Sequence, residues 1–198
     1  MSLVERVKQI LLSPRTEWEA IDGESTTPAA LYTGYIIPLA AIGPIAQVIG
    51  YSVLGMRVPF TGTVWRTPIG SAITGAVVSY VLTLVGVFVL ALIIDALAPS
   101  FDGTKSQIQA LKVATYSSTA GWVSGIFALI PGLRFLGILG LYSLYLLYLG
   151  LPVLMKAPKE KAVGYTVVVI VAAIVLFMII GLVGSRFMTT PMSGMMGQ

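Results

Sequence analysis

The stretch IGSAITGAVVSYVLTLVGVFVLALIIDAL, residues 69–97, holds a single charged side chain, Asp95, in its whole length. A helix needs about 20 apolar residues to cross the hydrocarbon core of a bilayer. This stretch therefore predicts a transmembrane helix. The whole composition agrees, because 57% of the 198 residues are hydrophobic and only 10% are charged, whereas soluble domains average about 25% charged residues.

Other apolar stretches reach or approach the same length, so the sequence predicts an all-α, polytopic membrane protein with five transmembrane helices. Besides residues 69–97, the predicted spans are residues 31–54, 113–130, 135–155 and 163–183. Thr27-Pro28 and Thr67-Pro68 each place a capping side chain before a proline at the start of a span. An alternative map, in which the second span is split or the third is re-entrant, stays open.

A single membrane domain is expected over residues 1–198, because no Ser/Pro-rich or charged linker divides the chain. No cleaved signal peptide is predicted, since charged residues interrupt the first apolar stretch. The predicted parts are a cytoplasmic interfacial segment (1–27), the five-span bundle (28–184) and a flexible external tail (185–198).

Basic residues set the predicted orientation. Eight lie on the side of the N-terminus and four on the other side. Because cytoplasmic loops carry the excess of Lys and Arg, we expect the N-terminus in the cytoplasm and the C-terminus on the other side of the membrane. The eight are Arg6, Lys8, Arg15, Lys105, Lys112, Lys156, Lys159 and Lys161, and the four are Arg57, Arg66, Arg134 and Arg186.

The segment SPRTEWEAIDGES, residues 13–25, packs four acids around one tryptophan. Ser2 to Glu5 fits a capping box ahead of an apolar stripe, which predicts a short amphipathic helix on the membrane surface. A second short helix, with Trp18 and Ile21 toward the bilayer, would complete an interfacial elbow. An acidic docking surface for a basic partner is the alternative. The candidate interface residues are Glu17, Trp18, Glu19, Asp22 and Glu24.

Small residues recur every four positions in the second and third predicted spans, which gives each a narrow face where another helix can approach. Packing within the chain and homo-oligomerisation are both compatible with this pattern. The first span contains Pro38 and Pro44 and is expected to be kinked. The candidate packing or oligomer residues are Ser71, Gly75, Ser79, Gly121 and Gly125.

Polar side chains within or next to the spans form a candidate polar path. Asp95 lies near the end of its span, where it either pairs with Lys105 or Lys112 or acts as a proton-coupling or ligand-binding acid. Tyrosines at intervals of three cover one face of the fourth span. They either line the path or pack against neighbours. The path residues are Asp95, Lys112, Tyr116, Ser117, Thr119, Tyr142, Tyr145 and Tyr148.

Catalytic chemistry is not expected. The chain has no cysteine and no histidine, so the commonest general base and the thiolate nucleophile are missing, and no P-loop or other cofactor motif occurs. No cofactor or metal centre is predicted. No nucleic-acid partner is predicted either, because the basic residues are scattered rather than gathered on one face. The segment 188–196 contains four methionines, whose thioethers are soft ligands that suit Cu(I). The alternative is a flexible tail in which these methionines have no function.

Four blocks carry a family resemblance: LLSPRTEW (11–18), LYTGYIIPLAAIGPIAQVIG (31–50), ALKVATYSSTAGW (110–122) and LYSLYLLYLGLPVLMKAPKEKAVGYTVVV (141–169). They resemble the bacterial branch of the Yip family, whose domain is shared with Ypt/Rab-GTPase-interacting membrane proteins. The resemblance implies a bacterial inner-membrane protein with five spans, a cytosolic N-terminus and a periplasmic C-terminus. It implies no specific reaction or ligand, because the eukaryotic role with small GTPases and vesicles does not transfer to a bacterium.

The predicted function is that of a non-enzymatic membrane protein that scaffolds or organises partners by helix packing. Its expected partners are the lipid bilayer, further copies of the chain and other membrane proteins. One alternative is a small transporter or channel near Asp95, Tyr116 and Tyr145. Another is lipid handling through the lysine-rich loop 156–161.

Overall fold

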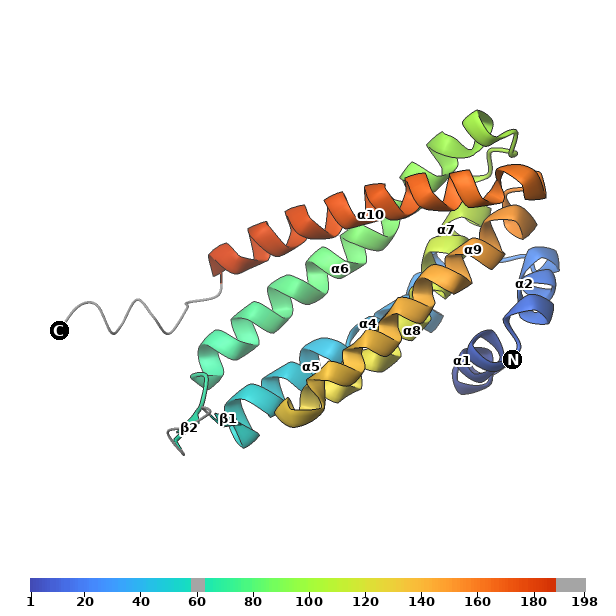
Figure 1. Ribbon diagram of the computed structural model, residues 1–198. Helices are drawn as coiled ribbons and strands as arrows, with labels where there is room; N and C mark the ends of the chain where they lie inside the picture. The colour runs from blue at the N-terminus through green and yellow to red at the C-terminus, as the bar shows by residue number, and fades with distance from the viewer. Residues whose placement is uncertain (58–62, 188–198) are drawn as a thin grey trace.

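The computed structural model describes residues 1–57 and 63–187. Within these ranges the chain is mostly helical. It also contains a two-stranded antiparallel ribbon, in which β1 (Met56–Arg57) pairs with β2 (Val64–Trp65). Most of the helices run along one common direction and form an elongated bundle (Figure 1). The all-α class is confirmed. The methionine-rich segment 188–196 lies outside the described residues.

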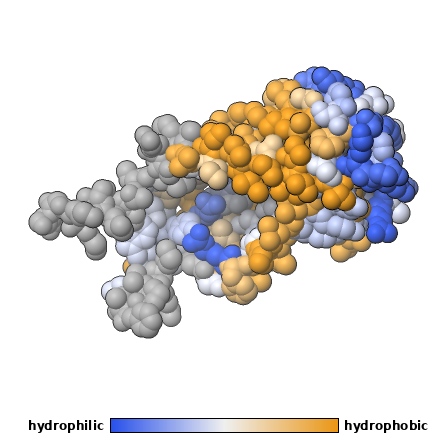
Figure 2. All heavy atoms as spheres, turned by 45° about the horizontal axis from the view of Figure 1, so that its top comes forward, coloured by the Kyte–Doolittle hydropathy of each residue, from blue (hydrophilic) through white to orange (hydrophobic). Residues whose placement is uncertain are grey.

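Four helical stretches are long and apolar enough to cross a membrane: Pro28–Leu54, Ile69–Phe101, Gly132–Leu154 and Lys159–Leu182. They correspond to the first, second, fourth and fifth predicted spans. Figure 2 shows apolar residues over much of the elongated body and hydrophilic residues gathered at one end. The chain is therefore built to present apolar side chains to lipid along its length.

The first stretch is irregular, as its prolines predict. Ala41 interrupts it between two α-helical pieces, and two segments are wound as π-helix. The Thr27 hydroxyl accepts a hydrogen bond from the amide of Ala30 and caps the start. The pieces are α3 (Pro28–Leu31), η1 (Tyr32–Ile36), α4 (Ile37–Ala40), α5 (Ile42–Val48) and η2 (Ile49–Leu54).

The second stretch joins α6 (Ile69–Leu97) to the 3₁₀ turn η3 (Ala98–Phe101). Pro68 occupies the N-cap of α6, which has no side-chain cap, so the predicted capping by Thr67 is not observed. The last long helix, α10 (Lys159–Phe187), packs along α6. The Tyr165 hydroxyl donates a 2.5 Å hydrogen bond to the Ile94 carbonyl, which fixes the two helices at one end.

Predicted span 113–130 falls within three short pieces: α7 (Gln107–Ser117), α8 (Thr119–Ser124) and the 3₁₀ segment η4 (Gly125–Leu129). The break at Ser118 has a local cause. The hydroxyls of Ser117 and Ser118 bond the carbonyls of Val113 and Ala114 at 2.6 and 2.7 Å, a pattern that weakens and bends helices. This region is not among the four stretches that meet the length and composition requirements for a span.

The chain then turns into η5 (Pro131–Leu141) and α9 (Tyr142–Leu154), which pack against α8 and α7 respectively. At the other end of the sequence, α1 (Leu3–Leu12) and α2 (Pro14–Gly23) form a helical hairpin. The Ser2 hydroxyl accepts from the amide of Glu5 at 3.2 Å and caps α1, as predicted. The hairpin lies at the end of the bundle where α9 finishes and α10 begins (Figure 1).

Candidate functional site

The α1–α2 hairpin is fixed to the bundle by a buried tryptophan. Trp18 is fully buried, and its indole lies against Gly150 of α9, where an added Cβ would come within 2.7 Å of the ring. The ring also meets Tyr116 edge-on, with centroids 6.2 Å apart. The expectation that Trp18 and Ile21 face the bilayer is therefore wrong, because both side chains are buried in the protein. Gly150 leaves the space that the indole fills.

Arg6 is the charged centre of this site. Its guanidinium donates to the carboxylates of Glu17 and Glu24, and it lies 5.7 Å from the ring centroid of Tyr116. The side chains of Arg6 and Glu17 are only 9% and 7% exposed, whereas Glu24 is 44% exposed. Burial alone would lower the pKa of Arg6, but the hydrogen bond and charge of Glu24, with further help from Tyr116 and Glu17, raise it above the usual value. Arg6 thus stays charged inside the hairpin.

Lys112 fixes the end of α2 to the bundle. Its ammonium donates to the carbonyls of Ile21 and Glu24 at 2.8 and 2.6 Å. A cation at a helix C-terminus is stabilised by the orphan carbonyls and by the helix dipole. Lys112 therefore joins two elements rather than lining a path.

The predicted acidic segment is mostly used within the chain. Glu17 and Glu24 hold Arg6, and Asp22 pairs with Lys156 at 2.5 Å and accepts from Gln109 at 3.2 Å. Glu19 remains exposed. An acidic docking surface is accordingly smaller than the sequence suggests, because three of the four acids already have partners inside this protein.

A short polar chain continues from this site into the bundle. The Tyr35 hydroxyl lies 2.8 Å from the Thr119 hydroxyl, and the rings of Tyr35 and Tyr116 meet with centroids 4.8 Å apart. All three side chains are buried. Ser117, also buried, bonds back to its own helix. Of the predicted path, Tyr116 and Thr119 are therefore brought together through Tyr35.

The tyrosines of α9 lie elsewhere. The Tyr142 hydroxyl donates to the Leu11 carbonyl at 3.1 Å and so supports the hairpin. Tyr145 packs beside Tyr142, with ring centroids 5.4 Å apart. Both Tyr145 and Tyr148 are 39% exposed on the surface. The structure thus separates these two rings from the buried Tyr116.

Asp95 lies near the end of α6, and its Oδ1 is buried without a hydrogen-bond partner. Within the described residues neither Lys105 nor Lys112 forms an ion pair with it. The predicted interfacial ion pair is therefore not observed.

In the lysine-rich loop, Lys156 pairs with Asp22, and Lys161 pairs with Asp102 at 2.5 Å.

The small-residue faces are partly filled by the chain itself. An added Cβ on Gly125 would come within 2.9 Å of the Gly43 backbone, so α5 and η4 touch through their glycines. The Gly121 amide donates to the Ser143 hydroxyl at 3.0 Å. On α6, Gly75 is buried and Ser71 and Ser79 are half-buried. The third-span face thus serves intramolecular packing.

Sequence reasoning missed Arg6, Tyr35 and Gly150. A signal existed for Arg6, because it follows Leu3 by three residues and precedes Ile10 by four, which places it within the apolar stripe of α1. No comparable local signal exists for Gly150. Its role depends on a tryptophan more than a hundred residues away in the sequence.

This chain is similar to proteins that are named as inner membrane proteins. The inner membrane protein YohC of Escherichia coli strain K12 is 29% identical over 118 residues, which is 60% of this chain and 60% of that protein. The YohC protein of E. coli strain CFT073 matches to the same extent. The match thus spans less than two thirds of these relatives. No solved structure matches.

The Yip1 domain matches residues 8–180, from α1 through most of α10. This region includes Trp18 of the docked hairpin, Lys112, the first three long apolar stretches and most of the fourth. The chain belongs to the Yip1 domain family.

Proposed function

We propose that this chain is an integral inner-membrane protein that organises membrane partners, including further copies of itself, by helix packing in the bilayer. The inner membrane is proposed from the printed name of the E. coli relatives. The proposed unit is a single membrane domain over residues 1–198, with a cytoplasmic segment (1–27), a bundle (28–184) and an external tail (185–198).

A five-pass topology is part of this proposal, with α7, α8 and η4 as the additional pass. In its support, α7 packs between α6 and α9, and α8 packs against η5. In Figure 1 these pieces run along the same direction as the long helices. The eight basic residues on the hairpin side favour a cytoplasmic N-terminus. The docked α1–α2 hairpin would then lie at the cytoplasmic membrane surface.

The observation that carries the organising role is the exposure of the second half of α10. From residue 170 to residue 182 no residue is buried, although this half-helix still touches the chain through residues such as Ile170 and Leu176. Its exposed side chains are large and apolar. Lipid covers such a face as well as a protein does, but helices that meet partners in the bilayer need this kind of available surface. The exposed residues are Val171, Ile174, Val175, Phe177, Met178, Ile179 and Leu182.

Chemical crosslinking in native membranes, followed by purification in a mild detergent, tests the proposal. We expect a discrete crosslinked species, either a homo-oligomer or a defined heteromeric complex, that Val175→Lys and Met178→Lys weaken. The matched control is Val77→Lys on the exposed side of α6. A strict monomer with no crosslinked partner would contradict the organising role.

Transport is the second candidate, and the partnerless Oδ1 of Asp95 favours it. A buried acid in a membrane protein is a candidate for proton or ligand coupling. The buried chain Tyr35, Tyr116 and Thr119 supplies further polar groups. Flux into liposomes that falls in Asp95→Asn and in Tyr116→Phe, but not in Tyr148→Phe, would support transport. Unchanged flux in all three variants would count against it.

A further inference from the structure

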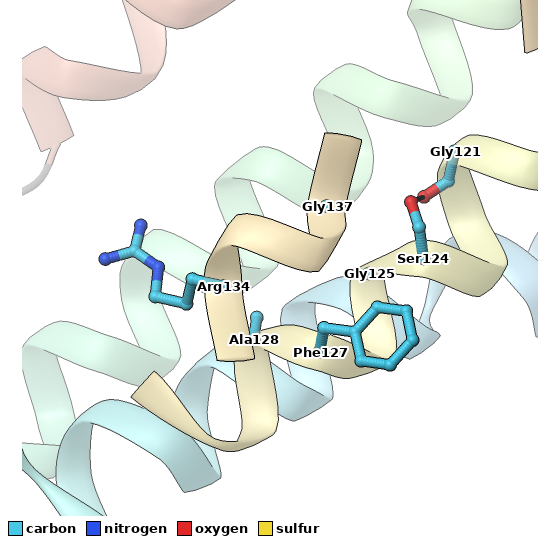
Figure 3. Close-up of a pocket in the computed structure, with 7 residues that line it drawn as sticks. All are labelled: Gly121, Ser124, Gly125, Phe127, Ala128, Arg134 and Gly137. Carbon is cyan, nitrogen blue, oxygen red and sulfur yellow. Dashed lines mark hydrogen bonds between the residues drawn. The ribbon is translucent and has the colours of Figure 1, made fainter. Parts of the chain in front are cut away.

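A small cavity lies between the hairpin-like pair η4 and η5, far from the α1–α2 hairpin (Figures 1 and 3). It is a hollow open to the surface, with a volume of about 130 Å³. Glycines form much of its wall, and no acidic side chain lines it. The lining residues are Gly121, Ser124, Gly125, Phe127, Ala128, Arg134 and Gly137.

Arg134 places a cation at this cavity. Figure 3 shows its side chain leaving η5 and extending away from Ser124, toward the outside. The guanidinium carbon lies 5.0 Å above the centroid of the Tyr51 ring, which holds the exposed side chain in a cation–π contact. The cation is therefore held at the rim of the cavity by a second element, η2.

No acidic side chain of the chain is available to neutralise Arg134. The sequence contains eight acids in all, and they lie in the α1–α2 hairpin, at the end of α6 with the turn after η3, and in the first turn of α10. These elements gather at the opposite end of the molecule in Figure 1. The eight are Glu5, Glu17, Glu19, Asp22, Glu24, Asp95, Asp102 and Glu160.

Arg134 lies at the start of a long apolar stretch, far from every acidic side chain of the protein. Arg134 lies in the first turn of Gly132–Leu154, which is long and apolar enough to cross a membrane. As a membrane span, this stretch would place Arg134 near the lipid headgroups. A cation near the end of a membrane span is stabilised by an anion or by the headgroup region. The wall is also unusual, because η5 is wound as a 3₁₀ helix for 11 residues, whereas such runs seldom exceed about four residues.

We propose that this cavity binds one anionic phospholipid, with its phosphate against the Arg134 guanidinium and its glycerol or the start of an acyl chain in the glycine-lined hollow. Arginine matches phosphate through paired hydrogen bonds. The apolar cavity accounts for binding of an amphiphile rather than of an inorganic ion. The site is independent of the organising role proposed for α10.

The test is native mass spectrometry of the full chain in detergent, titrated with phosphatidylglycerol or with phosphatidylcholine of the same acyl chains. We expect one retained phosphatidylglycerol, bound about tenfold more tightly than phosphatidylcholine, since a hydrogen-bonded ion pair contributes on that scale. Arg134→Gln should remove the preference. Arg66→Gln, which removes another exposed cation that does not line the cavity, should leave it within about twofold.

Gly137→Leu tests the cavity separately. Gly137 lines the hollow, an added Cβ there meets nothing within 4 Å, and leucine favours helical backbone. It should reduce retention of both lipids, whereas Gly132→Leu, equally unobstructed but outside the lining, should not. Three results would overturn the proposal: equal effects of Arg66→Gln and Arg134→Gln, no loss in Gly137→Leu, or displacement of the lipid by excess inorganic phosphate.

Discussion

Replacing Arg6 with methionine should detach the α1–α2 hairpin from the bundle. Methionine keeps an unbranched apolar stem like that of arginine but leaves the Glu17 carboxylate, only 7% exposed, buried without its cation. Removing one partner of a buried ion pair costs about 3–5 kcal/mol. Glu24 adds little to this figure, because at 44% exposure it can be rehydrated.

The chain has no cysteine, so a single Ile21→Cys reports on docking through its reaction with a membrane-impermeant maleimide. Ile21 is fully buried beneath the hairpin, and its labelling requires local opening. When opening is fast, the labelling rate follows the open population. The stated cost predicts labelling about a hundredfold to a few thousandfold faster in Arg6→Met than in the parent.

Two further variants distinguish loss of the buried ion pair from loss of a positive charge in general. Lys8→Met removes an exposed cation of the same helix and should leave the labelling rate unchanged. Arg6→Met combined with Glu17→Met removes both buried charges and should recover most of the protection, because an apolar pair can replace a buried ion pair. Unchanged labelling in Arg6→Met, or equally fast labelling in the double variant, would show that the buried Arg6–Glu17 ion pair does not hold the hairpin on the bundle.

The remaining predictions concern the same end of the bundle. Gly150→Ala should lower the unfolding temperature and open the hairpin, because the added Cβ comes within 2.7 Å of the Trp18 indole. Lys112→Met should weaken docking by about 1.5–3 kcal/mol, measured by the same maleimide labelling, since it removes a charged donor from two carbonyls. Tyr35→Phe should cost about 0.5–1.5 kcal/mol in chemical unfolding through loss of the hydroxyl contact to Thr119.

Each of these variants has a matched control in the chain. Gly164→Ala also replaces a helical glycine, but its Cβ would meet Phe101 at an ordinary 3.5 Å, so it should be neutral or stabilising. Lys105→Met removes an exposed lysine, and Tyr148→Phe an exposed hydroxyl. If a control perturbs the protein as much as its partner variant, the contact assigned to that partner variant does not stabilise the fold.

Hydropathy predicted five spans, and four of them correspond to long apolar helical stretches, because the requirement to cross lipid is local and acts on length and composition alone. The irregular first stretch was predictable for a similar reason, since Pro38 and Pro44 act on their own turn. The interruption of the third predicted span at Ser118 was not. Its cause is a competition between serine hydroxyls and helix geometry, which hydropathy does not measure.

The candidate site was only partly predictable. The acids, Trp18 and Lys112 stood out in the sequence, but their environment depends on contacts between distant segments. A tryptophan in an amphipathic helix has the same sequence signature whether it faces lipid or a protein groove. The position of Gly150 decides between the two, and local patterns in the sequence do not reveal that pairing.

The organising role proposed for α10 can be measured with a photo-crosslinking maleimide attached to single cysteines along residues 170–182 in native membranes. We expect protein adducts on one face of the half-helix, at positions such as Val171, Val175 and Met178, and none at Val81 on the exposed side of α6. Lipid adducts alone at every position, or equal protein capture from α6 and α10, would contradict it.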